Sequence, residues 1–215
     1  MNKLLTGLLL GAMLGALGSC KESSRIPAPA VTSVPLIFAK ASPDPTKSYF
    51  NTTRAAVSTN NLPRLADPTR PVFEFSFDVP NQRDVQLQAV EVYKSFQRGV
   101  RIGPRVLVGS YTSFPATVTL TSQEALTGLQ QLFFSSPSAT LPTLRNLLGA
   151  TANAPNEIFS GDLVVFTFEY VLRDGSRVVL TPLADVKLAG GGVAKVISGT
   201  QINPPYALYA KFAVL

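Results

Sequence analysis

The sequence contains no histidine, no tryptophan and a single cysteine among its 215 residues. A Ser-His-Asp triad, a Cys-His dyad, a histidine metal cluster and a cysteine zinc site all need residues that are absent or too few. With one cysteine, the chain cannot form an internal disulfide. We therefore expect no metal and no cofactor, and an enzymatic function is the less favoured prediction.

Charged residues are also scarce, at 15% of the chain. Lys and Arg number 19 against 13 Asp and Glu, which gives a formal net charge of +6. Apolar residues make up 46% of the chain, enough to build a buried core. The length suits one or two domains of about 100–200 residues each.

The most informative segment is the N-terminus. Lys3 is followed by the uncharged run Leu4–Ser19, which consists mostly of Leu, Gly and Ala. This run is shorter than the roughly 20 residues that a membrane-spanning helix needs. It is typical of a secretory signal peptide.

The run ends in Leu17-Gly18-Ser19-Cys20, which resembles the bacterial lipobox. The resemblance implies cleavage between Ser19 and Cys20 and attachment of a diacylglycerol to the Cys20 sulfur. We predict a cleaved signal peptide over 1–19, a lipidated cysteine with a flexible tether over 20–30, and anchoring to the cell envelope. Because no Asp follows Cys20, we expect the outer membrane. A plain signal peptide or an uncleaved anchor is the alternative.

The next part of the chain is rich in proline, with eight prolines between residues 21 and 71. Proline disfavours helix and regular sheet interiors. We expect 31–71 to be the irregular first part of the folded domain, with an edge strand within Val34–Ala39. The alternative is that all of 21–71 is linker.

From residue 73 the pattern predicts strands. Phe73, Phe75, Phe77 and Val79 alternate with polar residues, as in a strand with one buried face. In 85–96 the phase of the apolar residues changes, which predicts a β-bulge near 89–90. Further strands are expected at 105–111, 116–120, 163–172, 177–181, 184–188, 193–197 and 206–214, with an Asp174-Gly175 hairpin turn.

Two short helices are expected within this strand pattern. Thr121 and Glu124 form a capping box, and apolar residues follow at helical spacing as far as Phe133. This predicts a helix of about three turns. A second short helix is expected over 144–148.

The fold class predicted is all-β: an antiparallel immunoglobulin-like β-sandwich over 31–215, with one or two short helices in a connecting loop. A closed barrel is the alternative. The lipobox, the proline-rich segment, the 73–79 and 121–126 motifs, Gly161-Asp162 and Arg173-Asp174-Gly175 together resemble Bacteroidetes-type surface lipoproteins with immunoglobulin-like domains. That resemblance implies a fold and a location, and it transfers no catalytic residue.

One basic run is the main candidate site in the predicted domain. Lys94, Arg98, Arg101 and Arg105 lie in the predicted hairpin between the second and third strands, with no acidic residue among them. Such a cluster is able to contact a polyanion. The alternative is a solvated hairpin whose charges protect a sheet edge. Since only Phe96 lies among these cations, we expect no nucleic-acid partner.

Other candidates carry less weight. Glu74 and Asp78 share a strand face about 13 Å apart, too far for a glycosidase pair, and Asp162 and Asp174 fall at opposite ends of one strand. A loop with Asn153, Asn156 and Asp162 has oxygen ligands for calcium but lacks the acidic series of an EF-hand. The glycines 190–192 predict a turn rather than a phosphate loop. Tyr206 and Tyr209 are expected to pack in the core or in an interface, and exposure of one of them for ligand stacking is the alternative.

The function predicted from these features is a lipid-anchored, non-enzymatic binding or assembly module of the cell envelope. Its partners would be the membrane, through the lipid, and an unknown envelope protein or glycan. The first alternative is a structural lipoprotein that contacts membrane or polyanion. The second is a hydrolase based on two carboxylates or on Ser and Lys.

Overall fold

The computed structural model describes residues 33–44, 47, 50–52, 56–57, 72–81, 85–148, 158–159, 161–198 and 207–214. The predicted signal peptide, Ser19, Cys20 and the tether lie outside these residues, as do parts of the proline-rich region. Residues Ser33–Leu215 group into one unit.

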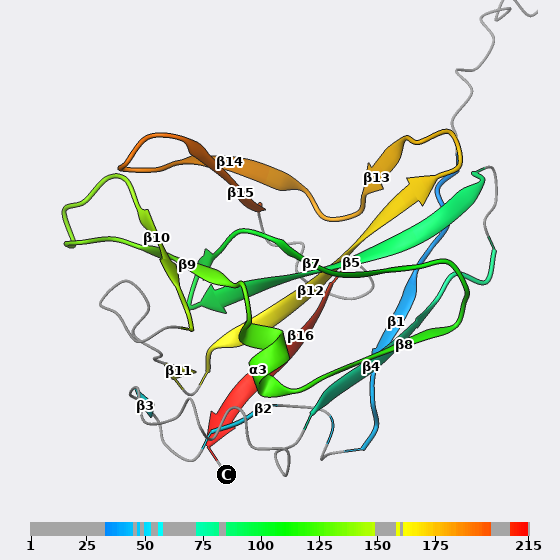
Figure 1. Cartoon of the computed structure of the whole chain (residues 1–215), viewed down its shortest axis with the longest axis horizontal. Coiled ribbons are helices and arrows are strands. Elements are labelled where there is room, and N and C mark those ends of the chain that lie inside the picture. Colours follow the sequence, from blue (N-terminus) through cyan, green and yellow to red (C-terminus); the bar gives the residue numbers. More distant parts are fainter. Residues whose placement is uncertain are drawn as a thin grey trace, which may run out of the picture. The chain divides into compact units, whose positions relative to one another are not determined.

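Two long strands, β5 (Leu87–Arg98) and β12 (Leu163–Leu172), form the centre of the main sheet and run side by side (Figure 1). The strands follow the order β2-β16-β12-β5-β6, and β13 and β7 also pair with β12 and β5 respectively. The outer strands are β2 (Phe50–Thr52), β6 (Arg101–Ile102), β7 (Val106–Tyr111), β13 (Arg177–Val179) and β16 (Ala207–Val214). All pairings are antiparallel except that of β2 with β16.

A smaller antiparallel sheet contains β1 (Phe38–Ala41), β4 (Phe73–Asp78) and β8 (Ala116–Leu120), with β4 in the middle. Three two-stranded ladders complete the described fold. They join β3 (Ala56–Val57) with β11 (Ile158–Phe159), β9 (Gln130–Phe133) with β10 (Thr143–Asn146), and β14 (Leu183–Lys187) with β15 (Val193–Ile197).

The core lies between β4 and the central strands of the main sheet. The rings of Phe73 and Phe166 stack with centroids 5.4 Å apart, and Phe75 lies 4.9 Å from Phe166. Phe77 packs on Phe168 at 5.5 Å. All five rings are buried, and each buried ring contributes about 1.5–3 kcal/mol through the apolar surface it removes from water. The apolar residues that alternate in 73–79 and 163–172 thus form the inner faces of two packed sheets.

The prediction of an all-β, antiparallel, sandwich-like fold is confirmed. The expected bulge is also present: the register between β5 and β12 shifts opposite Val171 and Leu172, between Leu87 and Ala89. The Asp174-Gly175 turn forms as predicted, with Gly175 at φ +83°. The first strand begins later than expected, at Phe38.

The predicted three-turn helix is wrong beyond its first turn and a half. Thr121 and Glu124 form the capping box of helix α3 (Ser122–Leu126), which has only five residues. Gly128 then adopts a left-handed conformation, with φ +76°, a typical helix-ending geometry. The following residues form β9, and the predicted helix at 144–148 is replaced by β10. The strands pair along their full lengths, so ladder hydrogen bonds override the helical spacing of the apolar residues.

Candidate functional site

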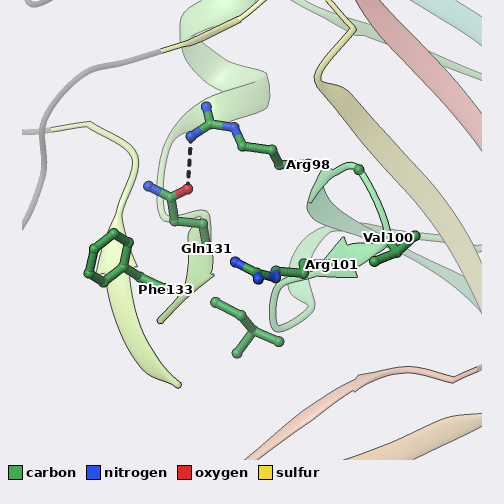
Figure 2. Close-up of a pocket in the computed structure, with 7 residues that line it drawn as sticks. Arg98, Val100, Arg101, Gln131 and Phe133 are labelled. Carbon is green, nitrogen blue, oxygen red and sulfur yellow. Dashed lines mark hydrogen bonds between the residues drawn. The ribbon is translucent and has the colours of Figure 1, made fainter. Parts of the chain in front are cut away.

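Three hairpin segments enclose a groove at one end of the main sheet. The turn between β5 and β6 forms one wall, β9 the second and the β14–β15 hairpin the third. Between the turn and β9 lies a cavity of about 400 Å³ (Figure 2). It is lined by Arg98, Gly99, Val100, Arg101, Gln131, Leu132 and Phe133.

A second cavity of about 510 Å³ extends toward the β14–β15 hairpin. It shares Gly99, Val100, Arg101 and Leu132 with the first cavity, so the two adjoin. Its lining adds Gln97, Ile102, Phe134, Val186, Val196 and Ile197. We call the two cavities together the hairpin groove. Their volumes fall in the range of about 300–1,000 Å³ that is typical of ligand pockets.

Close backbone approaches fix the walls of the hairpin groove. Gly99 has φ +57° and allows the tight turn that leaves Val100 96% exposed at its tip. Gly103 lies against β9, where a Cβ atom would collide with the carbonyl oxygen of Gln130. The amide of Ala189 donates to the carbonyl of Pro142 at 2.9 Å, which ties the β14–β15 turn to the segment before β10. The groove is therefore built by backbone contacts between separate parts of the sequence.

Arg98 is held by a buried carboxylate beside the groove. Its Nε and Nη2 donate to the two oxygens of Asp162 at 2.9 and 2.7 Å, and its Nη1 donates to Gln131 Oε1 at 3.1 Å (Figure 2). Asp162 also accepts the Phe159 amide at 2.8 Å. Since the Asp162 side chain is only 3% exposed, it neutralises Arg98 within the protein and fixes Gln131 in the groove wall.

Two other arginines stack on the aromatic rings of the groove. The guanidinium of Arg101 extends from the turn toward β9 (Figure 2) and lies 4.4 Å from the centre of the Phe134 ring. Arg145 stacks on Phe133 at 3.1 Å. Within the described part of the chain, neither Arg101 nor Arg145 forms an ion pair.

The structure places the four cations of the predicted basic run in different surroundings. Lys94 is buried on the core side of β5, where its amine donates to the backbone carbonyl of Glu124, and burial lowers the pKa of this amine. Arg98 pairs with Asp162, as described above. Arg105 pairs with Glu169 at 3.0 Å, and its guanidinium lies 4.3 Å from the centre of the Tyr93 ring. Of the four, only Arg101 is exposed.

A charged cluster that the sequence did not indicate lies on the face of the main sheet that points away from the aromatic core. Glu91 and Glu169 are partners across β5 and β12, and Arg177 donates to both, at 2.6 and 2.9 Å to Glu91 and 2.8 Å to Glu169. The Tyr93 hydroxyl donates to Glu91 at 2.6 Å. We call Glu91, Tyr93, Arg105, Glu169 and Arg177 the carboxylate–arginine cluster. Strand pairing across residues far apart in the chain creates it, so only the register would have revealed it.

The ionisation of the cluster follows from these bonds. Hydrogen bonds from Arg177 are the main cause of a lowered Glu91 pKa, and they outweigh the opposing effect of burial. The same bonds raise the pKa of Arg177 further. Burial and the Glu91 contact raise the pKa of Tyr93. Glu91 and Arg177 are thus held in their charged forms, which suits a structural ion-pair network.

The remaining acidic candidates make local contacts. Glu74 accepts the Lys47 amine at 3.2 Å and the Thr119 hydroxyl at 3.0 Å. Asp174 accepts the amide and the hydroxyl of Ser176, as expected for a turn residue.

Other predicted features fall partly outside the described residues, as Asn153, Asn156 and Tyr206 do. Tyr209 is 50% exposed on β16, so it is not a core residue, and its packing in an interface stays a prediction. Residues 190–192 form the predicted turn, with Gly191 and Gly192 at positive φ. Among the described residues, no three His, Cys, Asp or Glu side chains group as metal ligands, and no helix has the length and apolarity to cross a bilayer.

The side chains of the hairpin groove are aliphatic, aromatic, amide and guanidinium groups. Such groups hold a ligand by apolar contact, hydrogen bonding and charge. Among the described sites, the groove therefore has the shape and chemistry of a binding site. Comparisons of the chain with family models, with curated proteins and with solved structures find no match.

Proposed function

We propose that this protein is a lipid-anchored, non-enzymatic binding module of the bacterial cell envelope, and that the hairpin groove is its binding site. The observation that carries the proposal is the groove itself, where apolar side chains and an exposed guanidinium surround two adjoining cavities of about 400 and 510 Å³. Val100 is exposed at the tip of the turn and lines both cavities, so a ligand in either cavity would cover it.

The proposed anchor is supported by the sequence around Cys20. A signal-like apolar run ends at Leu17-Gly18-Ser19-Cys20, and a proline-rich segment follows. Acyl chains on Cys20 would hold the protein at the membrane, because each buried CH₂ contributes about 0.8 kcal/mol. The segment after it would give the domain reach from the membrane surface.

The anchor is tested by comparing the wild type with Cys20→Ser in bacterial cells. We expect the wild type to incorporate labelled palmitate and to sediment with membranes, and the variant to do neither. Labelling of Cys20→Ser equal to that of the wild type would contradict the lipid attachment.

The binding role is tested with the full chain as bait in detergent-solubilised envelopes and on a glycan array. Val100→Asp places a charge at the tip of the turn. Val193→Asp, 57% exposed on β15, opposite Lys187 and outside the lining of both cavities, is the matched control. We expect one defined envelope protein or glycan to bind the wild type and Val193→Asp but not Val100→Asp. No partner in either assay, or one retained equally by Val100→Asp, would contradict the proposal.

A further inference from the structure

The surface of the hairpin groove is mainly aliphatic where it is open to a ligand. Six branched aliphatic side chains line the two cavities: Val100, Ile102, Leu132, Val186, Val196 and Ile197. The two phenylalanines of the lining, Phe133 and Phe134, each have a guanidinium stacked on the ring. An apolar ligand would therefore meet alkyl groups more than aromatic faces.

The groove has two parts. Its two cavities share the wall formed by Val100, Arg101 and Leu132, and beyond this wall the first is lined by Phe133 of β9 and the second by Val186 and Val196 of the β14–β15 hairpin. A linear chain is able to follow this wall from one cavity into the other. Each CH₂ group that it buries would strengthen binding about fourfold.

The charge of the groove is positive. Among its described lining residues there are two arginines and no carboxylate. Asp162 neutralises Arg98, whereas Arg101 is exposed and forms no ion pair within the described residues. The Arg101 guanidinium lies 4.4 Å from the centre of the Phe134 ring, and a guanidinium carries five N–H donors in its plane that are able to bind an anion.

We propose that the hairpin groove binds a linear aliphatic carboxylate, with the alkyl chain against the aliphatic side chains and the carboxylate on Arg101. The inference goes beyond the proposed function, in which the groove binds an envelope protein or glycan, and it is tested independently of that partner. The carboxylate of the ligand matches a single guanidinium in geometry and charge. The alkyl chain of the ligand covers apolar side chains that would otherwise be exposed to water.

The test uses the full chain in its native membranes and a decanoate that carries a photoactivatable diazirine at the end of its alkyl chain. After irradiation, mass spectrometry maps the labelled peptides. Because the diazirine lies at the end of the chain remote from the carboxylate on Arg101, we expect label on the β14–β15 hairpin around Val186 and Val196. Unlabelled decanoate should displace the probe at a concentration at least tenfold lower than hexanoate, because hexanoate has four fewer CH₂ groups to bury.

Charge recognition is tested with decyltrimethylammonium, which has a chain of the same length and the opposite charge. We expect it to compete at least tenfold less well than decanoate in the wild type, and the difference to fall below about threefold in Arg101→Gln. Arg173→Gln, in the exposed turn after β12, is the matched control and should keep the wild-type preference. Equal competition by both amphiphiles in the wild type, or equal loss in both variants, would overturn the inference.

The position of the site is tested with Val100→Asp and Val193→Asp. Val100→Asp should lower labelling of the groove at least tenfold, while Val193→Asp should leave it unchanged. Label distributed over the chain without regard to these variants would overturn the inference. Such a result would leave the proposed function standing if Val100→Asp still abolished capture of a protein or glycan. Label in the groove with no captured partner would support the carboxylate site and contradict the partner.

Discussion

Glu91 and Glu169 lie directly opposite each other on β5 and β12, and one guanidinium, that of Arg177, donates to both. Like charges at opposed positions of an antiparallel pair destabilise a sheet. The two side chains are only 13% and 5% exposed, so water screens their repulsion little. The arginines of the cluster therefore make this pairing of β5 with β12 compatible with folding.

Replacing Arg177 by Gln should lower the free energy of unfolding by about 1–3 kcal/mol. The substitution removes the guanidinium that pairs with Glu91, and it leaves Glu169 paired with Arg105 among the described residues. The loss follows because a poorly exposed carboxylate without its partner is costly. Chemical denaturation followed by circular dichroism measures the change. The matched control is Arg173→Gln, which should stay within about 0.5 kcal/mol of the wild type. A loss no larger than that of the control would show that the cluster is energetically neutral.

The stability of the fold should fall in acid because of Glu91. Its pKa lies below the ordinary value of 4.5, mainly through hydrogen bonds from Arg177. A carboxylate with a lowered folded-state pKa stabilises the protein above pH 4.5 and loses this effect as the pH falls from there through the lowered value. We expect the wild type to lose unfolding free energy more steeply below pH 4.5 than Arg177→Gln. Parallel pH profiles for the two proteins, measured by urea denaturation, would disprove this assignment.

Gly103→Ala should destabilise the protein by about 1–3 kcal/mol and reshape the hairpin groove. The added Cβ would collide with the backbone carbonyl of Gln130, and backbone cannot rotate away as a flexible side chain can. Gly190→Ala is the control, because no heavy atom lies within 4 Å of the position its Cβ would take. Thermal unfolding and amide exchange at β9 would report the change. An Ala at 103 tolerated as well as an Ala at 190 would refute the close approach of the two backbones.

Phe166→Ala should cost about 3–5 kcal/mol, because the ring packs on both Phe73 and Phe75 between the two sheets. Phe38→Ala removes a ring of the same size that is 58% exposed on β1 and should cost less than about 1 kcal/mol. Guanidinium denaturation compares the two. Similar losses would mean that the sheets do not share an aromatic core.

Much of the fold was predictable because the pattern of apolar residues is local. Phe73, Phe75 and Phe77 alternate with polar residues, and the same period appears in β12, so the inner faces of both sheets could be read from the sequence. The segment 130–133 was wrongly predicted as part of a helix, because its apolar residues fit a helix as well as a strand. Pairing with β10 and the left-handed Gly128 decide between the two.

The carboxylate–arginine cluster and the hairpin groove could not be predicted from the spacing of residues along the sequence, because strand register and the meeting of distant segments create them. The four cations of the basic run are close in sequence, but strand alternation and the turn place them in different surroundings. Lys94 points to the core and Arg98 pairs with Asp162. Arg101 lines the groove and Arg105 pairs with Glu169. Glu91 and Glu169 are far apart in sequence, and only the register of β5 with β12 brings them together. The hairpin groove likewise needs three hairpin segments to meet, and no motif marks that meeting.

The pairing of β5 with β12 also governs how the chain folds. It joins residue 97 to residue 163 and residue 87 to residue 172, whereas the β9–β10 and β14–β15 hairpins join near neighbours. The chain must lose the entropy of closing these long loops before the aromatic core can form, so the central pairing sets the folding rate. Sandwiches dominated by such contacts fold in milliseconds to seconds, far more slowly than hairpins close. A newly made chain thus has its local turns long before β5 and β12 have paired.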